Sequence, residues 1–254
     1  KFTPDNPFFE TPREVPMEGG GALISFRDAT GCFNLNAFAK EQSGQRAAAP
    51  LLAELEQILG AAALENANAP RLAATIADWI DKDDFETAQG AEDGYYAGLP
   101  APYRTPGGAI SDISELRAMA GVGADEFIAI APLLCALPGF EPAPLNINML
   151  TPDDAALLVG LAGEDVSLAA AGAAIENRPK GGYASAEQFW SDAAFAGKQI
   201  ADEARERVKL NSQYVEADVA IRFADQTAAL TLLFELSENG EARLVSRRIA
   251  PVRQ

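Results

Sequence analysis

The order of hydrophobic patterns along this chain constrains its fold more than any other feature of the sequence. Apolar and polar residues alternate over residues 22–26, which is typical of a half-buried strand. From about residue 40 to residue 208, apolar residues instead recur at helical spacing, as at Leu72 and Ile76. Alternation returns over residues 210–249. The chain therefore has a long helical block between two strand-forming segments.

This order predicts an α+β fold in which a large all-α domain is inserted into a smaller domain built on an antiparallel sheet. We expect residues 1–39 to supply the lead-in and first strands, residues 40–208 the helical insertion, and residues 209–254 the C-terminal strands. Asn239-Gly240 is typical of a hairpin turn, so the last segment should form a three-stranded meander. Residues 22–36 should join the same sheet.

A small antiparallel sheet needs a layer packed against one face, because a bare strand pair is only marginally stable. The sequence offers no helix for this purpose except those of the insertion. The chain also begins at Lys1 and not at Met. We therefore expect the covering helix to precede Lys1.

The balance of charges excludes several classes of function. The chain has 37 acidic and 20 basic residues, which gives a formal net charge of -17. Such a surface repels nucleic-acid phosphates and anionic lipids and attracts divalent cations. The chain also has no histidine, so a Ser-His-Asp or Cys-His catalytic arrangement is excluded and a zinc site is hard to build. An enzyme would have to use carboxylates, Lys, Tyr or Ser.

The two cysteines, Cys32 and Cys135, are far apart in the sequence. An even count fits one disulfide formed in an oxidising compartment, and the alternative is a pair of buried thiols in a cytosolic protein. The sequence has no signal peptide and no apolar run long enough to span a bilayer.

Residues 78–93 contain seven carboxylates and one lysine. A loop of this kind repels itself unless it extends into water or closes on a cation, and Ca²⁺ suits a flexible set of oxygen ligands. Asp81, Asp83 and Glu92 occupy positions 1, 3 and 12 of an EF-hand count, but an oxygen ligand and a glycine are missing in between. The segment is therefore not an EF-hand. Its residues leave two interpretations open, a calcium-binding loop and a solvated acidic loop.

A Gly-hydrophobic-Gly turn lies at Gly121-Val122-Gly123, between two segments with helical patterns. It resembles a helix-hairpin-helix unit, whose turn offers backbone N–H groups to a phosphate. Working versions have Lys or Arg nearby, whereas here Asp125 and Glu126 follow and Arg117 is the nearest cation. A tight helix–helix turn is the favoured interpretation.

Three tyrosines follow the acidic segment and are interleaved with prolines: Tyr95, Tyr96 and Tyr103. They form either a packed, stiffened loop or a surface for a partner, since Tyr supplies contact area at little entropic cost.

Several motifs together resemble those of the general secretion pathway protein K family, the minor pseudopilins of the bacterial type II secretion system. They occur in the family's order over about residues 22–150, and the C-terminal strands agree as well. The motifs are Cys32-Phe33-Asn34-Leu35-Asn36, Asp78-Trp79-Ile80-Asp81-x-Asp83, Gly90-Ala91-Glu92-Asp93-x-Tyr95-Tyr96, Pro102-Tyr103-Arg104, Ser114-Glu115-Leu116-Arg117, Leu137-Pro138 and Asn146-Ile147-Asn148.

The resemblance implies a pilin-like α+β domain with a large inserted helical domain of the helix-hairpin-helix or SAM-like kind. It implies a periplasmic protein held in the inner membrane by an N-terminal helix that this chain lacks. Its place would be the tip of the pseudopilus, with the I and J minor pseudopilins as partners. There it would help to start assembly and support secretion, without catalysis and without binding nucleic acid.

The resemblance also implies calcium, because the helical domain of this family binds it. The ligands implied position by position are Asp81, Asp83, Glu92 and Asp93, with Asp78 and Asp84 as further candidates. The family's motifs do not require the cysteine pair, so the disulfide between Cys32 and Cys135 rests on their number and on the compartment.

Three other functions stay open from the residues alone. One is a calcium-braced, extracytoplasmic interaction domain of another assembly. Another is a carboxylate-based enzyme acting on glycans, which would need a cleft with two facing carboxylates. The last is a nucleic-acid module built on the Gly121–Gly123 turn, which the net charge disfavours.

Overall fold

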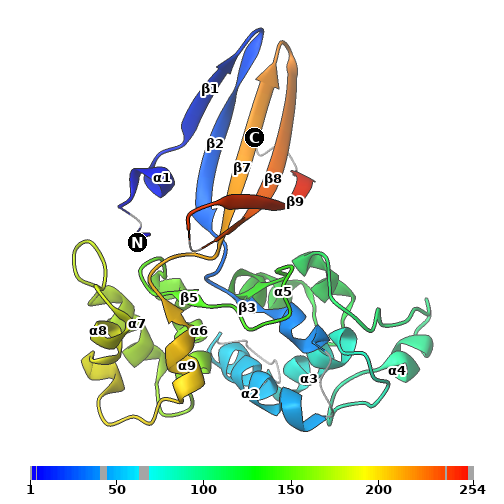
Figure 1. The fold of residues 1–254 in the computed structure, drawn as a ribbon. Helices are drawn as coiled ribbons and strands as arrows, with labels where there is room; N and C mark the ends of the chain where they lie inside the picture. Colours follow the sequence, from blue (N-terminus) through cyan, green and yellow to red (C-terminus); the bar gives the residue numbers. More distant parts are fainter. Residues whose placement is uncertain (1, 4, 41–44, 63–68, 238, 251–254) are drawn as a thin grey trace.

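A computed structural model describes residues 2–3, 5–40, 45–62, 69–237 and 239–250 of the chain. An antiparallel five-stranded sheet stands above a helical body, so the predicted α+β class is confirmed (Figure 1). In spatial order, the strands of the sheet are β1 (Arg13–Met17), β2 (Gly20–Asp28), β7 (Tyr214–Phe223), β8 (Gln226–Leu236) and β9 (Ala242–Ala250).

The predicted meander is confirmed, because β7 pairs with β8 and β8 with β9, both antiparallel. Residues 22–36 join this sheet only in part. Strand β2 pairs with β7, but Phe33–Asn34 (β3) pairs in parallel with β4 (Leu134–Cys135) inside the helical body. The lead-in contributes β1, a strand the sequence did not predict. It lies at the sheet edge, where Pro16 can be accommodated without removing an internal hydrogen bond.

Some of the described helices begin with a side-chain cap at the N-terminus. Ser185, for example, accepts a hydrogen bond from the Gln188 N–H at the start of α8. The α-helices are α1 (Pro7–Glu10), α2 (Gln45–Ala61), α3 (Ala69–Ile80), α4 (Asp93–Ala97), α5 (Ala124–Ile130), α6 (Ala155–Ala162), α7 (Leu168–Glu176), α8 (Ala186–Trp190) and α9 (Asp202–Arg207). The 3₁₀ helices are η1 (Leu35–Ala39), η2 (Ile113–Ala118), η3 (Ala131–Leu133), η4 (Pro152–Asp154) and η5 (Ala193–Phe195).

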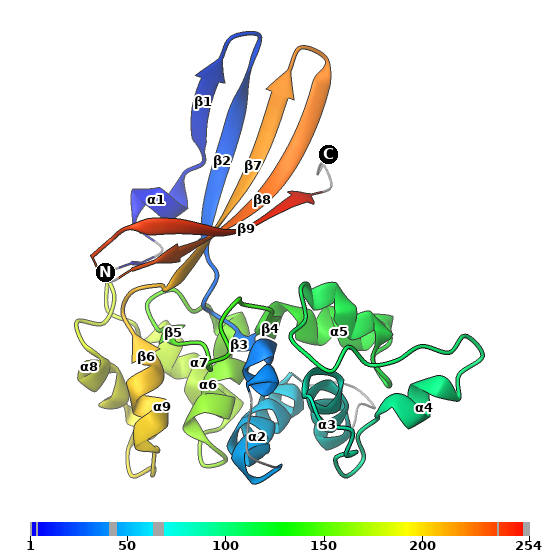
Figure 2. The same cartoon turned by 45° about the vertical axis from the view of Figure 1, so that its right-hand side comes forward.

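The helical body has two lobes, and each is closed at the end that faces the sheet by a short parallel strand pair. Strands β3 and β4 close the lobe that holds α2 to α5, and β5 (Leu145–Asn146) with β6 (Val208–Lys209) closes the lobe that holds α6 to α9 (Figure 2). The sequence predicted an all-α insertion. These strand pairs mean that the insertion is not strictly all-α. Each pair is followed by the same local turn, in which an asparagine side chain accepts a hydrogen bond from the N–H two residues later, at Asn34 and Asn146.

One continuous core joins the two lobes. It contains Leu55 and Ile58 of α2, Ile76 of α3 and Leu158 of α6, all almost fully buried. Helix α6 approaches α2 closely at Gly160, where an added Cβ would lie 2.4 Å from Ile58 Cγ1. The lobes therefore pack as one unit and hold the loops between their helices in place.

The sheet is tied to the helical body at its lower end. A disulfide joins Cys32 and Cys135, which are 103 residues apart, and Cys32 lies in a small apolar cluster with Tyr214 and Leu233 of the sheet. Arg248 of β9 also forms an ion pair with Asp112 of the helical body. These contacts, which link residues far apart in sequence, limit movement of the sheet relative to the lobes.

The two faces of the sheet differ in chemistry. Side chains alternate between faces along each strand, and the register places most of the large exposed apolar side chains on one face. At its lower end this face is covered, and Phe8 of α1 stacks on Phe26 there with ring centroids 4.2 Å apart. Farther along, large apolar side chains of this face are exposed to water: Val15, Met17, Phe223, Leu244 and Ile249. We call these five residues the open apolar face.

Candidate metal centre

The acidic segment begins at the end of α3, which is amphipathic and packs its apolar stripe into the core. Asp78 lies on this buried stripe and has no exposed surface. Its carboxylate accepts hydrogen bonds from the Thr87 N–H at 3.1 and 3.2 Å, which turns the loop back toward the helix. Burial raises the pKa of Asp78, and the hydrogen bonds from Thr87 oppose that rise.

A close approach at Gly90 brings the far end of the loop against Asp78. A Cβ at this position would lie 1.9 Å from Asp78 Oδ2, so no side chain fits while the carboxylate stays where it is. The next residues, Ala91 and Glu92, are buried and lead directly into α4. The two ends of the loop therefore meet at Asp78, and the residues between them, 82–86, are exposed to water.

Glu92 and Asp81 have carboxylate oxygens that are buried without a hydrogen-bond partner. Both oxygens of Glu92 and Oδ1 of Asp81 are in this state, and Glu92 is only 6% exposed. A buried polar atom without a partner is costly, most of all when it is charged. These oxygens therefore need a proton or a cation.

The acidic side chains act on one another electrostatically. Burial, together with the negative charges of Asp83 and Asp78, raises the pKa of Asp81 from 3.8 to about 7. Burial and the charges of Asp78, Asp81 and Asp84 likewise raise the pKa of Glu92 from 4.5 to about 7. Near neutral pH both carboxyls are thus poised to exchange protons for a bound cation.

The remaining predicted ligands are placed differently. Asp83 and Asp84 are exposed, and Asp83 Oδ1 accepts a hydrogen bond from the Phe85 N–H at 2.9 Å. Asp93 caps the neighbouring segment: its Oδ1 accepts hydrogen bonds from the Thr105 N–H and hydroxyl, and its Oδ2 lies 3.5 Å from Arg104 Nη1. The structure therefore brings Asp78, Asp81 and Glu92 together and engages Asp93 elsewhere.

The donor set fits a hard cation with oxygen ligands, since it consists of carboxylates, two of them with unpartnered buried oxygens. In the part of the chain that the structure describes, no three acidic or cysteine side chains are grouped so as to hold an ion as they stand. Binding would thus require the exposed carboxylates of the loop to move inward toward Asp81 and Glu92.

Aromatic side chains line the other side of this loop. Trp79 packs edge-on against Tyr96, with ring centroids 5.1 Å apart, and the Tyr96 hydroxyl accepts a hydrogen bond from the Ala120 N–H. Tyr96 is fully buried, whereas Tyr95 and Tyr103 are partly exposed. The three tyrosines therefore mainly support the loop by packing, and of the three only Tyr95 and Tyr103 are accessible to a partner.

The Gly121–Gly123 turn does not confirm the helix-hairpin-helix detail of the predicted fold. It lies between the 3₁₀ helix η2 and the short helix α5. The Gly123 N–H donates to Glu126 Oε2 at 3.0 Å. A carboxylate of the chain itself thus occupies the place where a phosphate would accept.

The structure offers little support for glycan hydrolysis. That chemistry requires two carboxyl groups on either side of the scissile bond. A pocket near α8 and α9 has one carboxyl group among its lining residues, that of Glu187. Sequence reasoning missed this pocket because its residues come from separate segments that share no motif.

Comparisons with known proteins agree on one family. Two sequence profiles described as "Type II secretion system (T2SS), protein K" match residues 31–139 and 145–211. A type II secretion system protein K of Pectobacterium carotovorum is 37% identical over 175 residues, covering 68% of this chain and 53% of that protein. That of Klebsiella pneumoniae is 33% identical over 183 residues, covering 72% and 56%. This chain therefore spans about half the length of these two relatives.

The fold also has a solved counterpart. A chain in the crystal structure described as the GspK-GspI-GspJ complex from the type 2 secretion system of enterotoxigenic Escherichia coli superposes with a TM-score of 0.81. The match covers 99% of this chain and 87% of that chain, at 23% sequence identity. Sheet, lobes and connections are thus shared over almost the whole chain.

Proposed function

Because the chain belongs to the type II secretion system protein K family, we propose that it is part of a minor pseudopilin at the tip of the secretion pseudopilus. In this role it binds other minor pseudopilins, of the I and J kind, and helps to start assembly. The role is one of binding, with no bond made or broken. The match to a GspK chain solved together with GspI and GspJ supports these partners.

The open apolar face is the observation that carries this proposal. Phe223 is 57% exposed and Ile249 is 88% exposed, on the same face of the sheet. Apolar surface of this extent marks a place where another element packs. In a pseudopilin, that element is an N-terminal helix of the same protein, which also anchors it in the inner membrane and leaves this part in the periplasm. None of the helices described here is long and apolar enough to cross a membrane.

We propose further that Ca²⁺ binds at the acidic loop. Asp81 and Glu92 would be its inner ligands, Asp83 and Asp84 would complete the set, and Asp93 would contribute only after releasing Thr105 or Arg104. Bound Ca²⁺ supplies positive charge that offsets the repulsion between these carboxylates. The loop would then hold the Tyr95 side of the lobe in one conformation for docking.

The division into residues 1–39, 40–208 and 209–254 remains a proposal. Phe33, Leu35 and Phe38 are buried in the core of the helical lobes. Their packing favours a first boundary near residue 31, ahead of β3.

Co-elution tests the assembly role. This chain is mixed with the periplasmic parts of the I and J proteins from the same secretion system and passed over a size-exclusion column. We expect a single complex at about 10 μM of each protein, a concentration at which micromolar affinities are visible. Separate elution under these conditions would contradict the proposed partners.

A pair of substitutions tests the covering helix in the full-length protein. Ile249→Asp places a charge beneath the helix and should lower the melting temperature. Leu23→Asp is the matched control, because Leu23 is a partly exposed residue of the opposite face. Equal effects of the two changes would argue against a helix on the open apolar face.

Chelation tests the metal proposal. Adding EGTA should lower the melting temperature of the protein, and adding Ca²⁺ should restore it, because a ligand that binds only the folded state stabilises it. Mg²⁺ is the control cation, since it demands a tighter octahedral site than this flexible loop provides. A melting temperature that changes with neither EGTA nor Ca²⁺ would refute the calcium site.

A further inference from the structure

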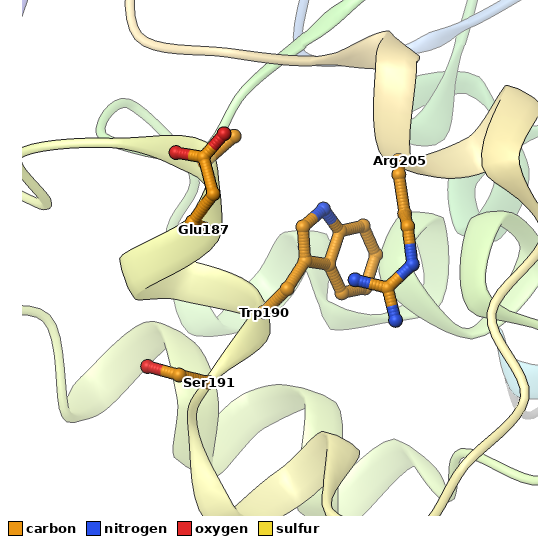
Figure 3. Close-up of a pocket in the computed structure, with 5 residues that line it drawn as sticks. Glu187, Trp190, Ser191 and Arg205 are labelled. Atoms are coloured by element: carbon orange, nitrogen blue, oxygen red, sulfur yellow. The ribbon is translucent and has the colours of Figure 1, made fainter.

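A pocket lies on the second lobe, away from the acidic loop in sequence and formed by different elements. It has a volume of about 270 Å³ and is lined by Ala186, Glu187, Trp190, Ser191 and Arg205. Helix α8 contributes most of these residues, and Arg205 comes from α9. Figure 3 shows the Trp190 indole between Glu187 and Arg205. Neither the assembly role nor the metal proposal uses this pocket.

Trp190 brings an unused hydrogen-bond donor to this pocket. The residue is buried, and its Nε1–H has no hydrogen-bond partner. Buried tryptophans usually find a partner for this group, because a buried donor without one destabilises the fold. Its ring is held by Phe189 and Phe195, with centroids 4.9 and 4.8 Å away, so the indole cannot easily turn to reach water. A ligand with an acceptor oxygen would satisfy the Trp190 N–H.

Arg205 brings a positive charge without an acidic partner. Its guanidinium lies over the Trp190 ring, 5.5 Å from the centroid, and its Nε donates to the Ile200 carbonyl at 3.4 Å. Within the described residues, no ion pair engages the two terminal nitrogens of Arg205. The planar end of the side chain is thus available to a carboxylate.

The opposite rim of the pocket offers acceptors. A hydrogen bond from Ser185 lowers the pKa of the exposed Glu187 carboxyl, whose oxygens are acceptors at this rim. The Ser191 hydroxyl donates to the Gln188 carbonyl at 2.7 Å and keeps its oxygen free to accept. The pocket therefore has donors on the Arg205 side and acceptors on the Glu187 side.

The volume limits what can enter. Pockets for drug-sized ligands and cofactors run from about 300 to 1,000 Å³. At about 270 Å³, this pocket takes one side chain with its adjoining main chain, and a nucleotide does not fit. The net charge of -17 adds a second limit, because it opposes the approach of a long acidic stretch.

We propose that this pocket binds a single Asp or Glu side chain presented by a segment of another protein. The carboxylate of that side chain pairs with Arg205 and accepts from the Trp190 N–H. A main-chain N–H of the same segment donates to Glu187. This binding site is independent of the proposed place of the protein in the pseudopilus.

The test uses N-acetyl-glutamate N-methylamide as the probe, with the glutamine analogue as its neutral counterpart. ¹H–¹⁵N NMR spectra of the whole chain report the indole N–H of Trp190, and Trp79, the only other tryptophan in the sequence, serves as internal reference. Because a single contact of this kind is weak, the probes are titrated to about 50 mM, which reveals millimolar binding. We expect the Trp190 indole signal to shift with the glutamate probe and not with the glutamine probe.

Two variants separate the site from general effects. Arg205→Gln should weaken binding of the glutamate probe at least tenfold, and Arg205→Lys should retain part of it. The control is Arg222→Gln, since Arg222 is exposed on the sheet. Unchanged spectra for Arg205→Gln outside the pocket establish that the variant is folded. A shift that is equal for both probes, no shift at all, or a shift that survives in Arg205→Gln would each overturn the proposal.

Discussion

Replacing Glu92 by Gln tests the physical argument for the acidic loop most directly. The substitution removes one negative charge and keeps the shape of the side chain. Both oxygens of Glu92 are buried without partners, and burial, together with the charges of nearby carboxylates, raises its pKa from 4.5 to about 7. Without Ca²⁺, we expect Glu92→Gln to stabilise the protein at pH 8, where wild-type Glu92 is ionised.

The magnitude follows from the pKa. A tenfold change in proton affinity corresponds to about 1.4 kcal/mol, so a rise from 4.5 to about 7 sets an upper limit of about 3 kcal/mol. Exposed loop residues and salt screen part of this repulsion, and the expected gain is therefore about 1–2 kcal/mol. For a chain of this size, that gain raises the melting temperature by about 3–6 °C.

The pH dependence has a defined sign. The folded protein binds a proton at Glu92 more tightly than the unfolded chain does, so the contribution of Glu92 to wild-type stability is fully present below about pH 4.5 and is lost as pH rises toward 7. Asp81, whose pKa is also raised to about 7, acts in the same direction. The advantage of Glu92→Gln should therefore vanish at pH 4. In excess Ca²⁺, the wild type should be more stable than Glu92→Gln, because the variant lacks one carboxylate that would bind the ion.

The assay is urea unfolding followed by circular dichroism at pH 4 and pH 8, with EGTA or with Ca²⁺. Glu86→Gln is the matched control, because Glu86 is an exposed carboxylate of the same loop and its removal should change stability by less than about 0.5 kcal/mol. If Glu92→Gln is less stable than the wild type at pH 8 in EGTA, Glu92 is not an unpaired charge in the folded protein and the reasoning is wrong.

Three further predictions concern packing and covalent links. In thermal unfolding with EGTA, Gly90→Ala should destabilise the protein by about 1–3 kcal/mol, because its Cβ meets the Asp78 carboxylate. Gly94→Ala is the control: its Cβ has open space, so it should be neutral or slightly stabilising. Replacing both Cys32 and Cys135 by Ala should lower the free energy of unfolding by about 2–5 kcal/mol, since the bond closes a loop of 103 residues; an unchanged urea midpoint would show that the bond adds no stability. Gly160→Ala should cost about 1–3 kcal/mol in the same urea assay, because its Cβ has no room against α2, and a loss below 0.5 kcal/mol would mean that the two lobes separate easily.

The sequence predicted those elements whose signal is local. The helix α3 follows from apolar residues at helical spacing, and strands β7, β8 and β9 follow from alternation, with the predicted hairpin turn at Asn239-Gly240 lying between β8 and β9. The capping box at Asp112 is local as well, because it needs only Glu115 three residues later, and the element it starts is a 3₁₀ helix. In each case the residues that decide the structure lie within a few positions of one another.

Other elements depended on distant residues. Strand β3 was expected in the large sheet, but Asn34 binds the carbonyls of Gly139 and Glu141 and draws the segment into the helical body instead. The Pro and Gly residues in and around strand β1 obscured any alternation of apolar and polar residues there. Its place is decided by pairing with β2, which no local pattern encodes.

The acidic loop shows the same division at the level of function. By itself, the sequence determined that carboxylates crowd between α3 and α4, that histidine chemistry is absent, and which family the motifs resemble. Only the tertiary structure decided that Asp78 is buried and closes the loop, that Glu92 lacks a partner, and that Asp93 turns to Thr105. The physical reason is that burial and hydrogen-bond partners depend on segments far apart in the chain, and these quantities set the pKa and the ligand capacity of a carboxylate.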